Sequence, residues 1–202
     1  VWAGLSCNGS DSASSVISLS LSINQLEGTL PPSLGSLTDV SVLSIVQGKL
    51  HGSIPAGVFQ LAKLTTCAFN KNKLTGTIPS EIGALSGLVQ LDLDHNELSG
   101  SLPRSLGALA MAVNIYININ LLTGTLPESI GSLSRLVIFG ANNNLFTGQI
   151  PSTIGALSEL VELFLNSNSL AGTIPASVGC LANLEVFQLS INCLSGSIPS
   201  TV

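Results

Sequence analysis

The sequence has few charged residues and few aromatic ones. Only 8% of its 202 residues are charged and 4% are aromatic, whereas 45% are hydrophobic. Six Lys and Arg residues oppose eleven Asp and Glu residues, which gives a formal net charge of −5. A surface with so few basic groups cannot neutralise many phosphates, so we expect no nucleic-acid partner. The hydrophobic fraction is also too high for a disordered chain.

Long apolar runs and metal motifs are missing as well. No uninterrupted apolar run approaches the roughly 20 residues that a membrane helix needs, so we expect no membrane span in this chain. No basic stretch followed by an apolar one opens the sequence, so we expect any secretory signal to lie outside it. The four cysteines are Cys7, Cys67, Cys180 and Cys193, and they form neither a C-x-x-C pair nor a zinc spacing. We therefore expect no metal site and no cofactor.

What the sequence does contain is a repeat of 24 residues. Eight of its nine prolines lie 24 residues apart, and eight glycines keep the same interval three positions earlier. The prolines are Pro31, Pro55, Pro79, Pro103, Pro127, Pro151, Pro175 and Pro199, and the glycines run from Gly28 to Gly196. Such a period predicts a solenoid, in which each coil buries its apolar side by stacking on its neighbours.

Each period reads L-x-x-L-x-L-x-x-N-x-L-x-G-x-I/L-P-x-x-I/L-G-x-L. Its first part alternates between apolar and polar residues, as in residues 91–94, which predicts a half-buried strand. The Gly-x-I/L-Pro segment should be extended, because Pro neither donates a ladder bond nor continues a helix. The closing stretch, for example Ser132-Leu133-Ser134, should form a 3₁₀ or irregular turn on the outer side.

The cysteines take different positions in this pattern. Cys67 falls on an apolar position, so we expect a buried thiol. Cys180 and Cys193 fall in different parts of neighbouring coils, so we expect no bridge between them.

An asparagine follows the strand in most coils. The ladder consists of Asn24, Asn72, Asn96, Asn120, Asn144, Asn168 and Asn192. A buried amide at this position can bond backbone groups of its own coil and of an adjacent one. Gly48 interrupts the ladder in the second repeat, where we expect water or a local distortion.

These motifs resemble the plant-type extracellular leucine-rich repeat, whose mark is L-x-G-x-I-P in a 24-residue unit. The resemblance covers about residues 16–202 as eight repeats, the last incomplete and without a C-terminal cap. Residues 1–15 are then a partial N-terminal cap, since residues 2–7 (WAGLSC) are similar to the family's W-x-G-V-x-C. In the family that Cys pairs with one a few residues upstream, which this chain lacks.

The resemblance implies an α/β leucine-rich repeat solenoid. We expect a right-handed superhelix with a parallel concave β-sheet, a second short β-sheet and a 3₁₀ or irregular convex side. Side chains on the concave face are not needed by the core, which suits them to recognition. The candidate ligand-binding residues there are Asp92, Asp94, His95, Tyr116, Asn118, Asn142, Phe164 and Asn166.

Asp92, Asp94 and His95 lie within four positions, as a metal or acid–base site would require. No further carboxylate is expected next to them to complete a metal site. An open face is also not expected to exclude water and shift a pKa, as general acid–base catalysis requires. We interpret the trio as an acidic recognition spot or as a solvated face. Tyr116 and Phe164 are candidate anchors, with packing against neighbouring side chains as the alternative.

The second short sheet carries an alternative site. Two columns rich in Ser and Thr flank the glycine column, and they contain Thr75, Thr77, Ser99, Ser101, Thr123, Thr125, Thr147 and Thr173. Flat, uncharged hydroxyl ladders could order water, and some plant repeat proteins of this type bind ice. The alternative is that Thr simply suits an extended strand.

The expected function is non-enzymatic, because nothing in the sequence pairs a nucleophile with a base. We expect an extracellular module, secreted or the ectodomain of a membrane receptor, that binds a protein, peptide or glycan through its concave face. Ice binding and inhibition of a cell-wall polygalacturonase are the alternatives. One glycosylation sequon at Asn8 agrees with secretion.

Overall fold

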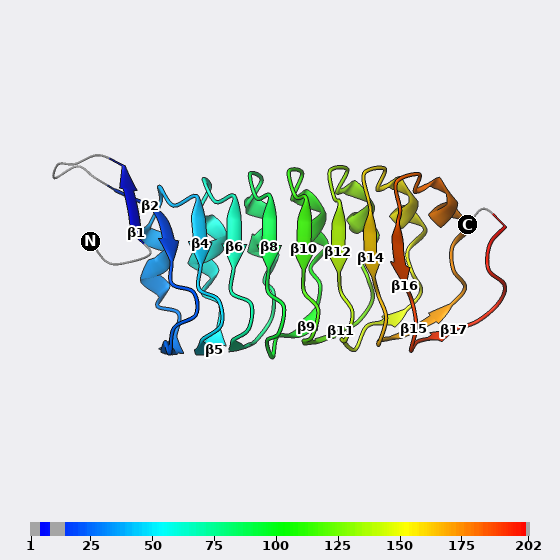
Figure 1. Cartoon of the computed structure of the whole chain (residues 1–202), viewed down its shortest axis with the longest axis horizontal. Helices are drawn as coiled ribbons and strands as arrows, with labels where there is room; N and C mark the ends of the chain where they lie inside the picture. Colours follow the sequence, from blue (N-terminus) through cyan, green and yellow to red (C-terminus); the bar gives the residue numbers. More distant parts are fainter. Residues whose placement is uncertain (1–4, 9–14, 201–202) are drawn as a thin grey trace.

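The computed structural model describes residues 5–8 and 15–200, and only the backbone for residues 5–8. Within these ranges the chain forms a row of stacked coils, with one long sheet on one face (Figure 1). The sequon at Asn8 and the motif residues Trp2 and Cys7 fall outside the described side chains. Their roles therefore stay predictions.

The long sheet has nine strands and forms the concave face that the repeat predicts. They are β1 (Leu5–Asn8), β2 (Ser15–Ser20), β4 (Val42–Ser44), β6 (Thr66–Ala68), β8 (Gln90–Asp92), β10 (Asn114–Tyr116), β12 (Ile138–Gly140), β14 (Glu162–Phe164) and β16 (Val186–Gln188). From β2 to β16 the strands pair in parallel with partners 24 residues apart, as Ile115 does with Phe139. β1 pairs with β2 in the antiparallel sense, which the repeat does not predict.

The second sheet is broken into three short pieces. They contain β3 (Glu27–Thr29), β5 (Lys49–Ser53) and β7 (Lys73–Thr75), then β9 (Ser99–Ser101) and β11 (Leu121–Thr123), then β13 (Thr147–Gly148), β15 (Ser169–Gly172) and β17 (Cys193–Leu194). Paired residues here are 22 apart, as Ser101 and Thr123 are. Neighbours in this sheet therefore come from different columns of the repeat.

The convex side consists of seven 3₁₀ helices within the described ranges, where no α-helix occurs. They are η1 (Pro32–Ser36), η2 (Ala56–Gln60), η3 (Ser80–Ala84), η4 (Arg104–Ala108), η5 (Glu128–Ser132), η6 (Ser152–Ala156) and η7 (Ala176–Cys180). Each follows an extended proline, such as Pro127 with φ −71° and ψ 141°. The turn predicted at residues 132–134 thus begins four residues earlier, directly behind the proline. No described helix has the length and hydropathy to cross a membrane.

Buried apolar side chains from every coil fill the space between these three sides. Leu91, Ile115, Phe139 and Leu163 are fully buried and come from four successive strands of the long sheet. Cys67 is the buried thiol that the pattern predicts, and burial raises its pKa to about 12. Cys180 and Cys193 are exposed and unbridged, which confirms that prediction.

The asparagine ladder forms as predicted across the middle coils. Asn96 Oδ1 accepts a hydrogen bond from the Leu74 N–H, and its Nδ2 donates to the carbonyls of Phe69, Leu93 and Asp94. Asn72, Asn120 and Asn144 are buried in the same way, Asn168 and Asn192 are half-buried, and Asn24 is exposed. The ladder thus satisfies the turn that follows each strand.

The expected distortion at Gly48 is absent from the backbone. Gln47, just before it, has φ 58°, and the equivalent residues of the other coils have φ between 51° and 58°. The Gly48 N–H donates to the Lys71 carbonyl, as the Asn72 N–H does to His95 one coil later. Bonds between coils therefore hold the turn in its shape where the side-chain amide is missing.

Candidate functional site on the concave face

The concave face contains a hollow of about 370 Å³. Its lining residues are Asp94, Tyr116, Asn118, Gly140, Asn142, Phe164 and Gln188. Five of them are predicted site residues, and strands β8 to β16 bring them together from five successive coils (Figure 1). Gly140 and Gln188 were not predicted.

Gly140 forms the floor of the hollow between two aromatic rings. It pairs with Tyr116 on one side and with Phe164 on the other, so the two rings stand two strands apart. A Cβ at Gly140 would lie 3.2 Å from Tyr116 Cδ1 and 3.1 Å from Asn118 Oδ1. The Tyr116 ring therefore leans over the space that a side chain would fill.

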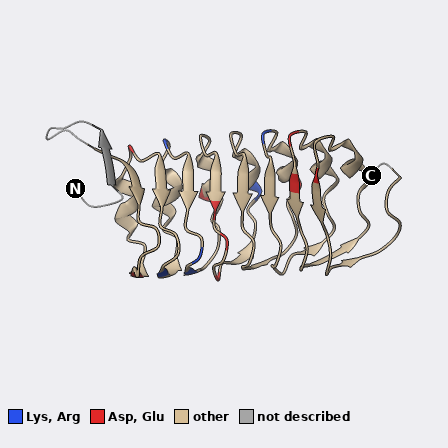
Figure 2. Ribbon diagram, in the orientation of Figure 1, with Lys and Arg blue, Asp and Glu red and all other residues tan. Residues whose placement is uncertain are grey.

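Acidic groups stand on both sides of the hollow. Asp92 and Asp94 come from β8 and the residues after it, and Glu162 begins β14, two residues before Phe164 and hence on the same face. Figure 2 shows acidic residues on both strands. Burial raises the pKa of the Tyr116 phenol, and the charges of Glu162, Asp92 and Asp94 raise it further.

The expectation that an open face leaves pKa values unshifted was wrong for Asp92. Burial, and then the charge of neighbouring Asp94, raise its pKa to about 6. Its carboxylate is half-buried and Oδ1 accepts only a long bond of 3.4 Å, from the Asp94 N–H. The two carboxylates share one strand face, so the second charge is added next to the first.

Asp94 is the most connected member of the predicted trio. Its Oδ2 lies 3.0 Å from His95 Nδ1 and accepts a 3.4 Å bond from Asn118 Nδ2, whereas its Oδ1 is buried without a hydrogen-bond partner. His95 has φ 51° and lies in the turn beyond the strand, not on the strand face. Among the described residues no group of three or more His, Cys, Asp and Glu could hold a metal ion.

Two predicted residues lie next to the hollow without lining it. Asp92 acts on it through its charge, and Asn166 stands one coil beyond Asn142. Glu162 was missed, although its spacing from Phe164 places both on one face of the strand. The period of two that identified the concave face could have found it.

The hydroxyl surface on the second sheet is exposed but is not a pair of straight columns. Thr77 faces Ser99 and Ser101 faces Thr123, each across the offset of 22 residues. Seven of the eight predicted residues are exposed, and Ser99 is half-buried. A third exposed column beside them carries Lys49, Lys73 and Glu97 at the start and Leu121 and Leu145 further on. The surface is therefore charged over its first coils.

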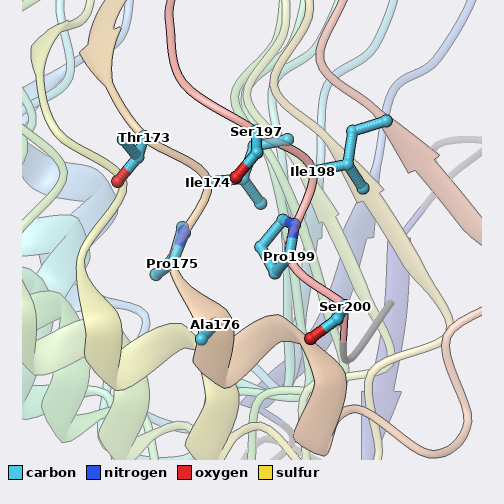
Figure 3. A pocket seen from close by; sticks show the side chains of 8 residues that line it. All are labelled: Thr173, Ile174, Pro175, Ala176, Ser197, Ile198, Pro199 and Ser200. Carbon is cyan, nitrogen blue, oxygen red and sulfur yellow. The ribbon is translucent and has the colours of Figure 1, made fainter.

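Three other hollows have less chemistry to offer. One lies between the last two coils and is lined by Thr173, Ile174, Pro175, Ala176, Ser197, Ile198, Pro199 and Ser200 (Figure 3). It contains neither a charged nor an aromatic side chain. Two more run along the flank of the stack beside Val113, Val137 and Val161. The concave hollow alone of these four combines aromatic rings, amides and a carboxylate.

Comparison with known proteins gives a consistent class. A family model described as Leucine Rich Repeat matches residues 15–37, 87–109 and 159–181. No curated protein sequence matches the chain. The fold and these matches define an extracellular plant-type leucine-rich repeat protein, and the chain belongs to this family.

Solved structures of plant proteins are similar over nearly the whole chain. The structure of PEPR1 with AtPEP1 is 34% identical, covers 96% of this chain and 27% of that one, and has a TM-score of 0.91. The ectodomain of the Arabidopsis receptor kinase HAESA, in complex with an IDA peptide hormone, is 35% identical over 99% of this chain and 34% of that one, with a TM-score of 0.88. The chain thus spans about a third or less of these receptor chains.

A plant ice-binding protein shares the fold too. It is 25% identical over 98% of this chain and 79% of that one, with a TM-score of 0.67.

Proposed function

We propose that this chain is an extracellular recognition module that binds an extended peptide across the strands of its concave face. The observation that carries the proposal is the hollow around Gly140, where two aromatic rings meet a row of amides and a carboxylate. Aromatic side chains are the usual anchors of interfaces, and they stand here on a rigid sheet.

The polar row suits a peptide backbone. Asn70, Asp94, Asn118, Asn142 and Asn166 follow one another at one residue per coil. With strands about 4.8 Å apart the row is about 19 Å long, which matches about six residues of an extended peptide at roughly 3.3 Å each. The Oδ1 atoms of Asn70, Asp94 and Asn166 are buried without partners, so they are free to accept peptide N–H groups.

The similar receptor chains support this proposal. PEPR1 was crystallised with AtPEP1, and HAESA with a peptide hormone. Both proteins share the fold of this chain at 34% and 35% identity.

A random hexapeptide library displayed on phage tests the proposal without a guess about the ligand. The purified protein should select peptides, and the double variant Tyr116→Ser/Phe164→Ser should fail to retain them. A variant with Thr123→Ser and Thr125→Ser on the second sheet is the control and should select as the wild type does. If no peptide is enriched, or if the double variant enriches the same peptides, the proposal is wrong.

A second candidate function rests on the hydroxyl surface. Thr123, Thr125 and Thr147 are exposed, and the outward positions beside them are uncharged. The similarity to a plant ice-binding protein supports this candidate. The charged residues Lys49, Lys73 and Glu97 restrict the uncharged surface to the later coils.

Inhibition of ice recrystallisation by the purified protein tests this candidate. Activity that disappears when Thr75, Thr77, Thr123 and Thr125 become Lys, but persists in Tyr116→Ser/Phe164→Ser, would make the second sheet the functional surface. No inhibition at high protein concentration would remove ice binding as a function.

A further inference from the structure

The rings of Tyr116 and Phe164 leave room for a flat group between them. Their strands are separated by the strand of Gly140, so they stand about 9.6 Å apart at the usual spacing of roughly 4.8 Å. A group midway between them lies about 5 Å from each strand position. This distance is within the reach of about 6 Å over which a cation is attracted by an aromatic face.

The charge of the hollow has one sign. None of the residues that line it is Lys or Arg, whereas Asp92 and Asp94 stand at one side and Glu162 at the other. The other titratable groups facing it are the Tyr116 phenol and the imidazole of His95, which binds Asp94 Oδ2. A cation entering here meets three carboxylates and would relieve their mutual repulsion.

One carboxylate oxygen also lacks a donor. Asp94 lines the hollow, and its Oδ1 is buried without a hydrogen-bond partner. An acceptor that has lost water without gaining a donor costs free energy, and a charged donor from a ligand would restore that bond.

We infer, resting on the proposed peptide binding, that the hollow receives an arginine side chain of the peptide, with its guanidinium between Tyr116 and Phe164 and bonded to Asp94. A guanidinium is planar, stacks on aromatic faces and carries five donors, so it can fill the slot and serve the carboxylate together. A lysine ammonium is a compact point charge that matches the slot less well.

The test uses hexapeptides selected from the phage library and synthesised in two forms. One form keeps the arginine and the other replaces it with citrulline, which is neutral and nearly the same shape. Calorimetry should show that the citrulline form binds on the order of tenfold more weakly, as expected for the loss of a charge-assisted bond. The variants Asp94→Asn and Glu162→Gln should weaken the arginine form and leave the citrulline form little changed.

The variant Glu97→Gln is the control, because it removes one exposed carboxylate from the second sheet. It should leave both affinities as in the wild type. Selected peptides without a preferred arginine, or equal binding of the two forms, would overturn the inference and leave the proposed function in place. Failure to select any peptide would overturn both.

Discussion

The Oδ1 atom of Asn96 accepts a hydrogen bond of 2.9 Å from the backbone N–H of Leu74, 22 residues earlier in the chain. The same amide donates to the Phe69 carbonyl of the previous coil at 3.0 Å. One side chain thus joins two coils through backbone groups that have no water to turn to.

Truncation of this side chain should be costly. Asn96→Ala leaves the Leu74 N–H and several carbonyls unpaired in a buried site, at about 1–3 kcal/mol for each unsatisfied group that water does not reach. We expect a loss of about 3 kcal/mol, read from the midpoint of urea unfolding. Asn24→Ala is the matched control, because Asn24 is exposed and donates a single printed bond to Ser22. Similar losses in both variants would contradict the role of the buried ladder.

The stability of the protein should depend on Asp92 in a defined pH window. Its pKa is about 6 in the folded chain against 3.8 ordinarily, so the folded state holds this proton more tightly. The contribution of Asp92 to stability is therefore complete below about pH 4 and is lost as the pH rises through about 6. Asp92→Asn should raise the unfolding midpoint over the wild type at pH 7.5 and leave it nearly unchanged at pH 4. A difference that is the same at both pH values would count against the shifted pKa.

The turn after each concave strand stores strain where its residue is β-branched. Ile23 has φ 57° and is 75% exposed, so its conformation is disfavoured and little burial compensates. Ile23→Asn should stabilise by about 1 kcal/mol, because Asn tolerates this region far better. The reverse change one hundred and twenty residues later, Asn143→Ile at φ 53°, should destabilise by a similar amount. Thermal unfolding of the two variants checks the pair, and shifts of the same sign would refute the explanation.

The glycines of the 3₁₀ helices allow the convex side to stack closely. A Cβ at Gly131 would lie 2.4 Å from the Thr153 carbonyl oxygen, so Gly131→Ala should cost about 1–3 kcal/mol through overpacking. Gly87 offers the comparison, since a Cβ there meets nothing nearer than 3.9 Å. Gly87→Ala should be neutral or stabilise by up to about 1 kcal/mol. Chemical denaturation compares the two, and equal effects would rule out the close stacking as the cause.

The fold could be predicted from the sequence because one rule repeats without insertions. Pro127 and its seven equivalents set the period, and the alternation at residues 91–94 sets which side chains face the core. The 22-residue register of Ser101 with Thr123 could not be read in this way. It depends on the path of the chain through the turns and not on which residues are apolar.

The candidate site was only partly predictable. Tyr116 and Phe164 were found because they are aromatic residues at outward strand positions. Gly140 was not, because the contribution of a glycine is the space it leaves, and that space appears only when its neighbours are placed. The raised pKa of Asp92 was missed for the same reason, since it comes from burial and the nearness of Asp94.

The uniform pairing of each coil with the next has a mechanical consequence. Hydrogen bonds such as that from the Ile117 N–H to the Gly140 carbonyl hold coil to coil all along the stack. A pulling force applied to the two chain ends would act first on a terminal coil and peel the stack one coil at a time. Each release would lengthen the tether by the contour of 24 residues, about 80 Å at roughly 3.4 Å per residue, and would give a regular sawtooth of force against extension.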